Sequence, residues 1–232
     1  MIKIDAIFAG KQEAIVDKKG QKYISSYKKK SLNKKVFVNY LGLENDTQGD
    51  SSHHGGVDKA ICVYTQKAYD FLKETHDIKL PACAFGENLI LADVDDGDFC
   101  IGDIYRCGEI IFEVSQPRPP CWRISSVMGI KNLTSLVVKE AKTGFYMRVL
   151  KEGILDINNP LELLSRPNKG ITIELLSKCS FDAKNNQENI RKILSCSGLA
   201  AAFRTTLVRR LKNQDSGLQD WQKDEFKDKV LL

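Results

Sequence analysis

The chain has 232 residues, a length that fits one main domain with a small appendage. Its 42% hydrophobic and 28% charged residues are ordinary for a soluble globular protein, and no apolar run approaches the roughly 20 residues of a membrane span. The net charge of +5, from 35 basic and 30 acidic residues, suits an anionic cofactor or substrate but gives no argument for a nucleic-acid partner.

From the N-terminus to about residue 115 the chain is predicted to be mostly β-strand. Strands are expected where apolar residues alternate or cluster between turn residues, at 1–9, 36–41, 60–64, 88–91, 99–101, 104–107 and 109–114. One helix is expected from Thr65, whose hydroxyl can cap it, to about Glu74. The Lys-rich stretch 10–35 is expected to form solvated loops and edge strands, with attraction of anions as the alternative role.

After Pro119 and Pro120 the period changes, and short helices are expected at 121–128 and 133–141. Strands return at 145–150 and 161–164, and three amphipathic helices follow near 172–179, 187–195 and 199–211. Many short strands with few long helices predict an α+β fold, an antiparallel barrel with peripheral helices. The expected organisation is a β-barrel domain over 1–168, a three-helix appendage over 169–212 and a polar tail over 213–232.

The seven cysteines indicate a reducing compartment. They are odd in number, scattered and without a CxxC pair, which is typical of free thiols in a cytosol rather than of a disulfide framework. Most of them are expected to be small core residues. The N-terminus lacks a basic segment followed by a long apolar one, so we expect a cytoplasmic protein without a signal peptide.

The segment from Ser115 to Trp122 contains three prolines and is the first candidate site. It directly follows a predicted strand, and its prolines fix φ and remove ladder donors, so the strand must end in a stiff loop. Cys121 then lies at the start of a predicted helix, near Arg118 and Arg123, where free N–H groups and positive charge favour a thiolate. A thiolate is either a nucleophile or a soft metal ligand; the alternative is an inert cysteine in a proline-rich loop.

The second candidate is a polar loop at 49–58, in which His53 and His54 are followed by Gly55 and Gly56. The two glycines permit the backbone to approach a ligand closely. Adjacent histidines point in different directions and no cysteine has zinc-ligand spacing, so a joint zinc site is not expected. The loop is therefore either part of a ligand site or a flexible surface loop.

Two further segments place polar residues next to predicted strands. In Gly86-Glu87-Asn88 the glycine indicates a bend, and the carboxylate or amide could bind the edge of a heterocycle, with turn capping as the alternative. Arg148 lies in the predicted strand 145–150 and could pair with a phosphate, because its planar guanidinium suits bidentate contacts.

Taken together, these segments resemble the MOSC family, the domain found at the C-terminus of molybdenum cofactor sulfurases, in its stand-alone bacterial branch. The shared motifs occur in order over about residues 1–166 and are Leu41-Gly42-Leu43-Glu44, Gly49-Asp50, His53-His54-Gly55-Gly56, Asp58-Lys59-Ala60, Phe85-Gly86-Glu87-Asn88-Leu89, Ile101-Gly102-Asp103, Val114-Ser115-Gln116-Pro117-Arg118, Pro120-Cys121-Trp122 and Tyr146-Met147-Arg148-Val149. Two positions depart from the family pattern: Val57 replaces a usual proline, and Asn45 replaces a usual glycine. Asparagine tolerates a left-handed backbone, so the turn at Asn45 can be kept.

The resemblance implies a closed, mostly antiparallel β-barrel with peripheral helices, followed by the three-helix appendage. It implies that Cys121 ligates the molybdenum of a molybdopterin cofactor, whose dithiolene supplies two further sulfurs. A thiolate suits this metal, which prefers soft donors. The residues that match the family's cofactor-binding motifs are His54, Gly55, Gly86, Glu87, Asn88, Arg118 and Arg148.

Members of this branch reduce N-hydroxylated compounds, including hydroxylamino-purines, with electrons from a separate reductase or flavoprotein. The resemblance therefore implies a molybdenum-dependent oxidoreductase in which Cys121 is the catalytic metal ligand. Two alternatives stay open: a sulfur carrier with a persulfide on Cys121, and a protein that stores or delivers the cofactor without turnover. We expect no nucleic-acid or membrane partner, and both a monomer and a homodimer fit the sequence.

Overall fold

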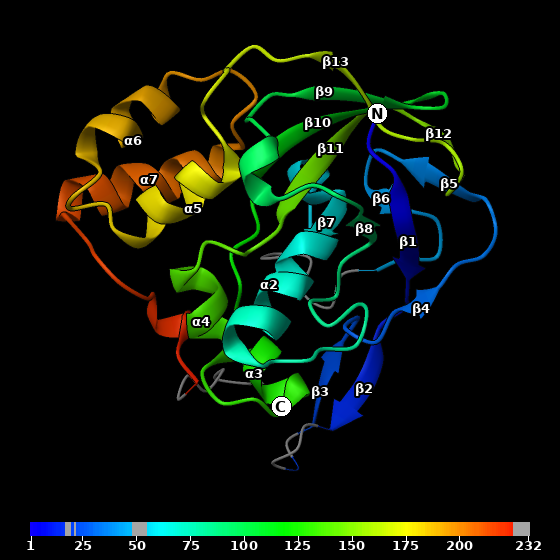
Figure 1. Cartoon of the computed structure of the whole chain (residues 1–232), viewed down its shortest axis with the longest axis horizontal. Coiled ribbons are helices and arrows are strands. Elements are labelled where there is room, and N and C mark those ends of the chain that lie inside the picture. Colours follow the sequence, from blue (N-terminus) through cyan, green and yellow to red (C-terminus); the bar gives the residue numbers. More distant parts are fainter. Residues whose placement is uncertain (17–19, 21, 48–54, 225–232) are drawn as a thin grey trace.

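One strongly curled sheet forms the centre of the molecule (Figure 1). The computed structural model describes residues 1–16, 20, 22–47 and 55–224. The eight strands of the sheet follow the order β13 (Glu162–Ser165), β9 (Ile104–Cys107), β10 (Ile110–Pro117), β11 (Phe145–Lys151), β7 (Ile61–Thr65), β8 (Leu89–Leu91), β1 (Ile4–Ala9) and β4 (Lys30–Ser31). Alternate residues of β11, Phe145, Met147 and Val149, share one face and belong to the main hydrophobic core.

The predicted α+β class is confirmed, but the sheet is mixed and open rather than antiparallel and closed. Strands β7 and β8 pair in parallel, with Val63 opposite Leu89. The edges of the sheet are β13 and β4. A single bridge between Ile2 and Leu161 joins the chain ahead of β1 to the chain ahead of β13. One residue pair is not a strand ladder, so the sheet is a half-barrel and the expectation of a closed barrel is wrong.

The parallel pair exists because helix α2 (Gln66–His76) connects β7 to β8. Parallel neighbours need such a crossover, whereas a tight hairpin joins only antiparallel strands. The helix begins where the sequence predicts: the Thr65 hydroxyl accepts a hydrogen bond from the Ala68 N–H at 3.3 Å. Ala68, Tyr69 and Leu72 form its buried face.

Replacing this cap gives a first testable prediction. Thr65→Ala should lower the free energy of unfolding by about 1 kcal/mol, because the helix loses a side-chain acceptor for one of its unpaired N–H groups. Urea unfolding measures the change. The control is Thr205→Ala, at an exposed position within a helix, where the midpoint should stay the same or rise. Equal losses in both variants would contradict the capping role.

Two smaller sheets accompany the half-barrel. One contains β12 (Gly153–Leu155), β5 (Val36–Asn39) and β6 (Gly42–Leu43), and the other is a hairpin of β2 (Glu13–Val16) and β3 (Lys22–Ser25). The hairpin and β4 occupy the Lys-rich stretch expected to hold loops and edge strands. Asn45 follows β6 with a φ of 64°, so it adopts the left-handed conformation anticipated at this departure from the family pattern.

The described residues contain six α-helices. After β10 come α3 (Arg123–Met128) and α4 (Leu133–Lys139), and the C-terminal part forms α5 (Ile173–Phe181), α6 (Gln187–Leu194) and α7 (Ala201–Asn213), close to the predicted ranges. Leu176, Ile193 and Leu207 of the last three helices belong to the same hydrophobic cluster as the sheet, so the appendage packs directly on the half-barrel (Figure 1). Within the described ranges, no helix is long and apolar enough to cross a membrane.

One local expectation is corrected. Residues 99–101 were expected to form a strand, but they follow the 3-10 turn η2 (Asp96–Asp98) and make only one bridge, between Cys100 and Thr172. The described part of the 213–232 tail contains the 3-10 turn η3 (Asp220–Gln222), in which Gln222 is buried. The Trp122 N–H donates to the Trp221 carbonyl at 3.1 Å, which places this part of the tail beside the Cys121 segment.

Candidate functional site

A polar cavity of about 110 Å³ lies among segments that are far apart in the sequence. Its lining residues are Ile24, Ser25, Ser26, Tyr27, Lys29, Asp46, Thr47, Lys59, Cys62, Phe85, Gly86, Asn88, Arg118, Cys121, Arg123 and Tyr146. We call it the cysteine cavity. A water molecule takes roughly 30 Å³ in the liquid, so the space can receive part of a larger ligand.

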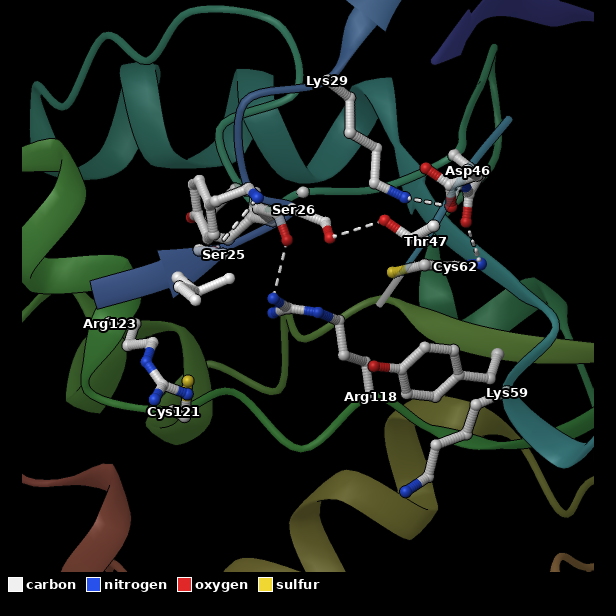
Figure 2. A pocket seen from close by; sticks show the side chains of 16 residues that line it. Ser25, Ser26, Lys29, Asp46, Thr47, Lys59, Cys62, Arg118, Cys121 and Arg123 are labelled. Atoms are coloured by element: carbon white, nitrogen blue, oxygen red, sulfur yellow. Dashed lines mark hydrogen bonds and ion pairs between the residues drawn. The ribbon is translucent and has the colours of Figure 1, made fainter. Parts of the chain in front are cut away.

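Arg118 extends into the cysteine cavity from the end of β10 (Figure 2). Its backbone N–H donates to the Gly144 carbonyl at 2.9 Å, and its Nη2 donates to the Phe85 carbonyl at 2.6 Å. Its Nη1 is buried and has no hydrogen-bond partner among the described residues. Because an unpaired buried donor is costly, this guanidinium is suited to an anionic acceptor on a ligand.

Cys121 differs from the other six cysteines in its exposure: they are buried, and it is half-buried. It lies just before α3, which begins at Arg123, and its side chain is beside that of Arg123 in the cavity (Figure 2). The Thr134 hydroxyl donates to the Cys121 carbonyl at 2.9 Å, which helps to fix the backbone that carries the thiol. An accessible thiol in cationic surroundings can act as a nucleophile or as a soft metal ligand.

A second cysteine, Cys62 on β7, also lines the cavity, and the sequence did not indicate it. Burial raises the pKa of its thiol to about 11, although Arg118 and Lys29 act in the opposite direction. Cys62 therefore stays protonated near neutral pH and is a poor thiolate ligand.

One side of the cavity is closed by a hydrogen-bonded network around Asp46. Lys29 pairs with the Asp46 carboxylate at 2.7 Å, and the Asn88 amide donates to it at 2.9 Å. The Asn88 carbonyl oxygen accepts from the Cys62 N–H at 3.0 Å. Asp46 is the one acidic residue of the described lining, and Lys29 neutralises it. Lys59, Arg118 and Arg123 add positive charge to the lining.

The structure brings four of the predicted site residues together: Gly86, Asn88, Arg118 and Cys121 line the same cavity. Gly55 is described but does not line it. His54, together with most of its polar loop, lies outside the described residues.

Glu87 and Arg148 do not line the cysteine cavity. Glu87 is fully buried and accepts hydrogen bonds from the Tyr69 hydroxyl at 2.5 Å and the Phe85 N–H at 3.1 Å, and burial raises its pKa. This placement agrees with the alternative of turn capping. Arg148 pairs with Asp58 at 2.7 Å and with Glu113, so two carboxylates already occupy its guanidinium. The cofactor contacts that the motifs imply for these two residues stay predictions.

Several other residues of the cavity were not among the predicted site residues. Tyr146 could have been found, because the two-residue period of β11 buries Phe145 and Met147 and turns Tyr146 to the opposite face. Lys29 lies in the stretch expected to be solvated, yet its side chain is only 8% exposed. Ser25, Ser26 and Thr47 carry no sequence signal, since only the folding of the hairpin brings them to the cavity.

The described residues contain no group of three or more His, Cys, Asp and Glu side chains placed to hold a metal ion. A metal bound at Cys121 would therefore take its other ligands from a cofactor or from solvent. The cavity as a whole can hold an anionic ligand beside a half-buried thiol.

Comparison with known proteins places this arrangement in a family. The model of the MOSC domain matches residues 50–162. Uncharacterized protein YflK of Bacillus subtilis is 36% identical over 191 residues, which are 82% of this chain and 86% of that relative. A protein named Reductase from Gibberella moniliformis is 30% identical over 167 residues, which are 62% of this chain and 29% of that protein.

The comparison of folds supports the same family. The crystal structure of YiiM from Geobacillus stearothermophilus superposes with a TM-score of 0.75 at 29% identity, and the match covers 91% of this chain and 100% of that one. The overall fold of this chain is thus similar to that of the Geobacillus stearothermophilus protein. The chain belongs to the MOSC domain family.

Proposed function

We propose that the cysteine cavity binds a molybdenum cofactor and that the protein uses it to reduce N-hydroxylated compounds. One observation carries the proposal: the half-buried thiol of Cys121 and the unpaired buried Nη1 of Arg118 belong to the same cavity. A soft metal ligand and a donor for an anion are the two protein groups that such a cofactor requires. The match to a fungal protein named Reductase supports the redox assignment.

The lining residues fit this cofactor in charge and chemistry. Molybdopterin is an anion with a phosphate, and Lys59, Arg118 and Arg123 supply positive charge around the cavity. The rings of Tyr27, Phe85 and Tyr146 supply flat surface that a heterocycle can contact. Burial raises the pKa of the Tyr146 hydroxyl above its usual value, so this group keeps its proton and can donate a hydrogen bond.

In this function the protein would bind, orient and shield the substrate, while the bound cofactor would supply the two-electron chemistry that converts an N–OH group and two protons to N–H and water. Cys121 would hold the metal through its sulfur, and Arg123 lies beside it. Arg118 would hold the anionic end of the cofactor, and the Asp46 network keeps that side of the cavity rigid. A separate reductase or flavoprotein would deliver the electrons.

Metal content tests the central step. Protein produced in a host that makes the cofactor should contain about one molybdenum per chain, and Cys121→Ala should lose most of it, because the metal loses its protein ligand. Cys62→Ala is the matched control, since it removes a second thiol from the same cavity, and it should keep its molybdenum. Elemental analysis that finds the metal unchanged in Cys121→Ala would overturn the assignment.

Turnover separates the enzyme from the two other functions of a cofactor-binding protein. The loaded protein, reduced by an artificial electron donor, should convert a hydroxylamino-purine to the amino-purine, and Cys121→Ala should not. A storage or delivery protein would hold molybdenum without this reaction. A sulfur carrier would show a mass increase of one sulfur on Cys121 that a thiol reductant removes.

A further inference from the structure

A second cavity, of about 120 Å³, lies at the seam between the half-barrel and the helical appendage. We call it the seam cavity. Gln116 of β10 and Arg118 line it from the barrel, and Phe203, Thr206 and Arg210 line it from α7. It shares Lys59 and Arg118 with the cysteine cavity, but Cys121 does not line it. The seam cavity is thus a neighbour of the candidate cofactor site and not a part of it.

Arg210 brings a buried positive charge to the seam cavity. Arg210 is only 1% exposed, and its Nη2 donates to the carbonyls of Phe181 at 3.1 Å and Gly217 at 2.9 Å. Its Nε is buried and has no partner within the part of the chain that the structure describes. The lining residues Lys59, Arg118 and Arg210 are basic, and none of the described lining residues is acidic.

Gln116 brings a buried acceptor to the same cavity. The residue is 2% exposed, and its Nε2 donates to the Pro117 carbonyl at 3.1 Å. Its Oε1 is buried without a partner among the described residues. Buried polar atoms are nearly always paired. The seam cavity thus has an unpaired cationic donor, Arg210, and an unpaired neutral acceptor, Gln116. This pair indicates a ligand that accepts from Arg210 and donates to Gln116.

We propose that the seam cavity binds a small oxyanion that carries its own hydrogen-bond donor, such as hydrogen phosphate. The oxygens of the anion pair with the Arg210 guanidinium, and its O–H group donates to Gln116 Oε1. Water molecules could satisfy both atoms, but only an anion also brings a negative charge to the buried Arg210 guanidinium. The proposal does not depend on the cofactor, because the residues that carry it lie outside the cysteine cavity.

The test uses two threonines that are adjacent on α7. Thr206 lines the seam cavity and Thr205 does not, although each hydroxyl donates to the carbonyl four residues earlier, at 3.2 Å and 3.1 Å. Thr206→Glu places a carboxylate at the cavity, whereas Thr205→Glu places the same group on exposed helix surface. Titration calorimetry at constant ionic strength measures the binding of inorganic phosphate and of sulfate to the full chain and to both variants.

Wild-type protein and Thr205→Glu should bind phosphate equally, and Thr206→Glu should bind it at least about tenfold more weakly, because the new charge repels the anion. Sulfate should bind the wild type about tenfold more weakly than phosphate, since at neutral pH it has no proton to donate to Gln116. Phosphate affinity that is equal in the two glutamate variants would overturn the proposal, and so would equal affinity for the two anions. If Thr206→Glu does not fold, Ala202→Glu, one helical turn earlier on the same cavity, replaces it.

Discussion

Arg118→Met is expected to weaken cofactor binding by roughly 30-fold to several thousand-fold, the equivalent of the 2–5 kcal/mol that removal of one partner from a buried charged pair costs. Its Nη1 is the buried donor that has no partner among the described residues, and its Nη2 already bonds to Phe85. The Nη1 group can therefore donate its hydrogen bonds to the ligand. Arg118→Lys should recover only part of the loss, because an ammonium keeps the charge but not the planar fork.

The measurement is retention of the pterin and of molybdenum during gel filtration, which does not require turnover. Arg106→Met is the matched control, since Arg106 forms an exposed ion pair with Glu162 at 2.5 Å and does not line the cysteine cavity. Exposed pairs of this kind contribute little to stability. Equal retention in the two methionine variants would show that Arg118 does not bind the cofactor. Thermal unfolding of the cofactor-free proteins identifies any loss that comes from misfolding.

Asp96 gives the second large expected effect, on stability as a function of pH. This residue is fully buried, and its Oδ2 accepts hydrogen bonds from the N–H groups of Thr143 at 3.1 Å and Gly144 at 3.0 Å. Burial raises the pKa of the carboxyl from 3.8 to about 7, against the effect of the two N–H groups, while Asp95 raises it further and Lys142 lowers it. The folded protein therefore binds this proton more tightly than the unfolded chain does.

The sign of the pH dependence follows from this difference in proton binding. Below pH 4 the carboxyl is protonated in both states, and its contribution to stability is complete. Between about pH 4 and pH 7 only the folded state holds the proton, so the free energy of unfolding should fall as the pH rises. At pH 8 Asp96→Asn, which is neutral at every pH and keeps an acceptor oxygen, should be more stable than the wild type by about 2–4 kcal/mol.

Urea unfolding between pH 4 and pH 8 measures this effect. The control is Asp93→Asn in the same loop: Asp93 is exposed and has a φ of 57°, a conformation that asparagine also tolerates. Its pH profile should follow that of the wild type. A profile for Asp96→Asn that also runs parallel to the wild type would contradict the raised pKa of Asp96.

Features that depend on neighbouring residues could be predicted from the sequence. The Thr65 cap, the limits of β9 and the three C-terminal helices follow from local spacing, because a helix or a strand displays its period in its own residues. The stiff end of β10, with Arg118 and Cys121 close behind it, follows from the prolines. Family motifs then identified four residues that the structure brings to one cavity.

Features that depend on distant partners could not be predicted in this way. The residue type and strand position of Arg148 suit a phosphate ligand, yet it pairs with Asp58, 90 residues away in the chain. Lys29 lies in a Lys-rich stretch that is typical of solvated loops, yet its side chain is buried and pairs with Asp46. β7 and β8 pair in parallel, so the sheet is mixed, although the many short strands with few long helices predicted an antiparallel barrel.

The sequence by itself therefore determined most of the strands and helices, the end of β10 at the prolines and the family. The tertiary structure alone decided which charges are neutralised, that Cys62 joins Cys121 in one cavity, and that a second basic cavity lies at the seam with α7. The physical reason is that periodicity and caps arise from interactions within a few residues, whereas burial and ion pairing depend on contacts that exist only once the chain has folded.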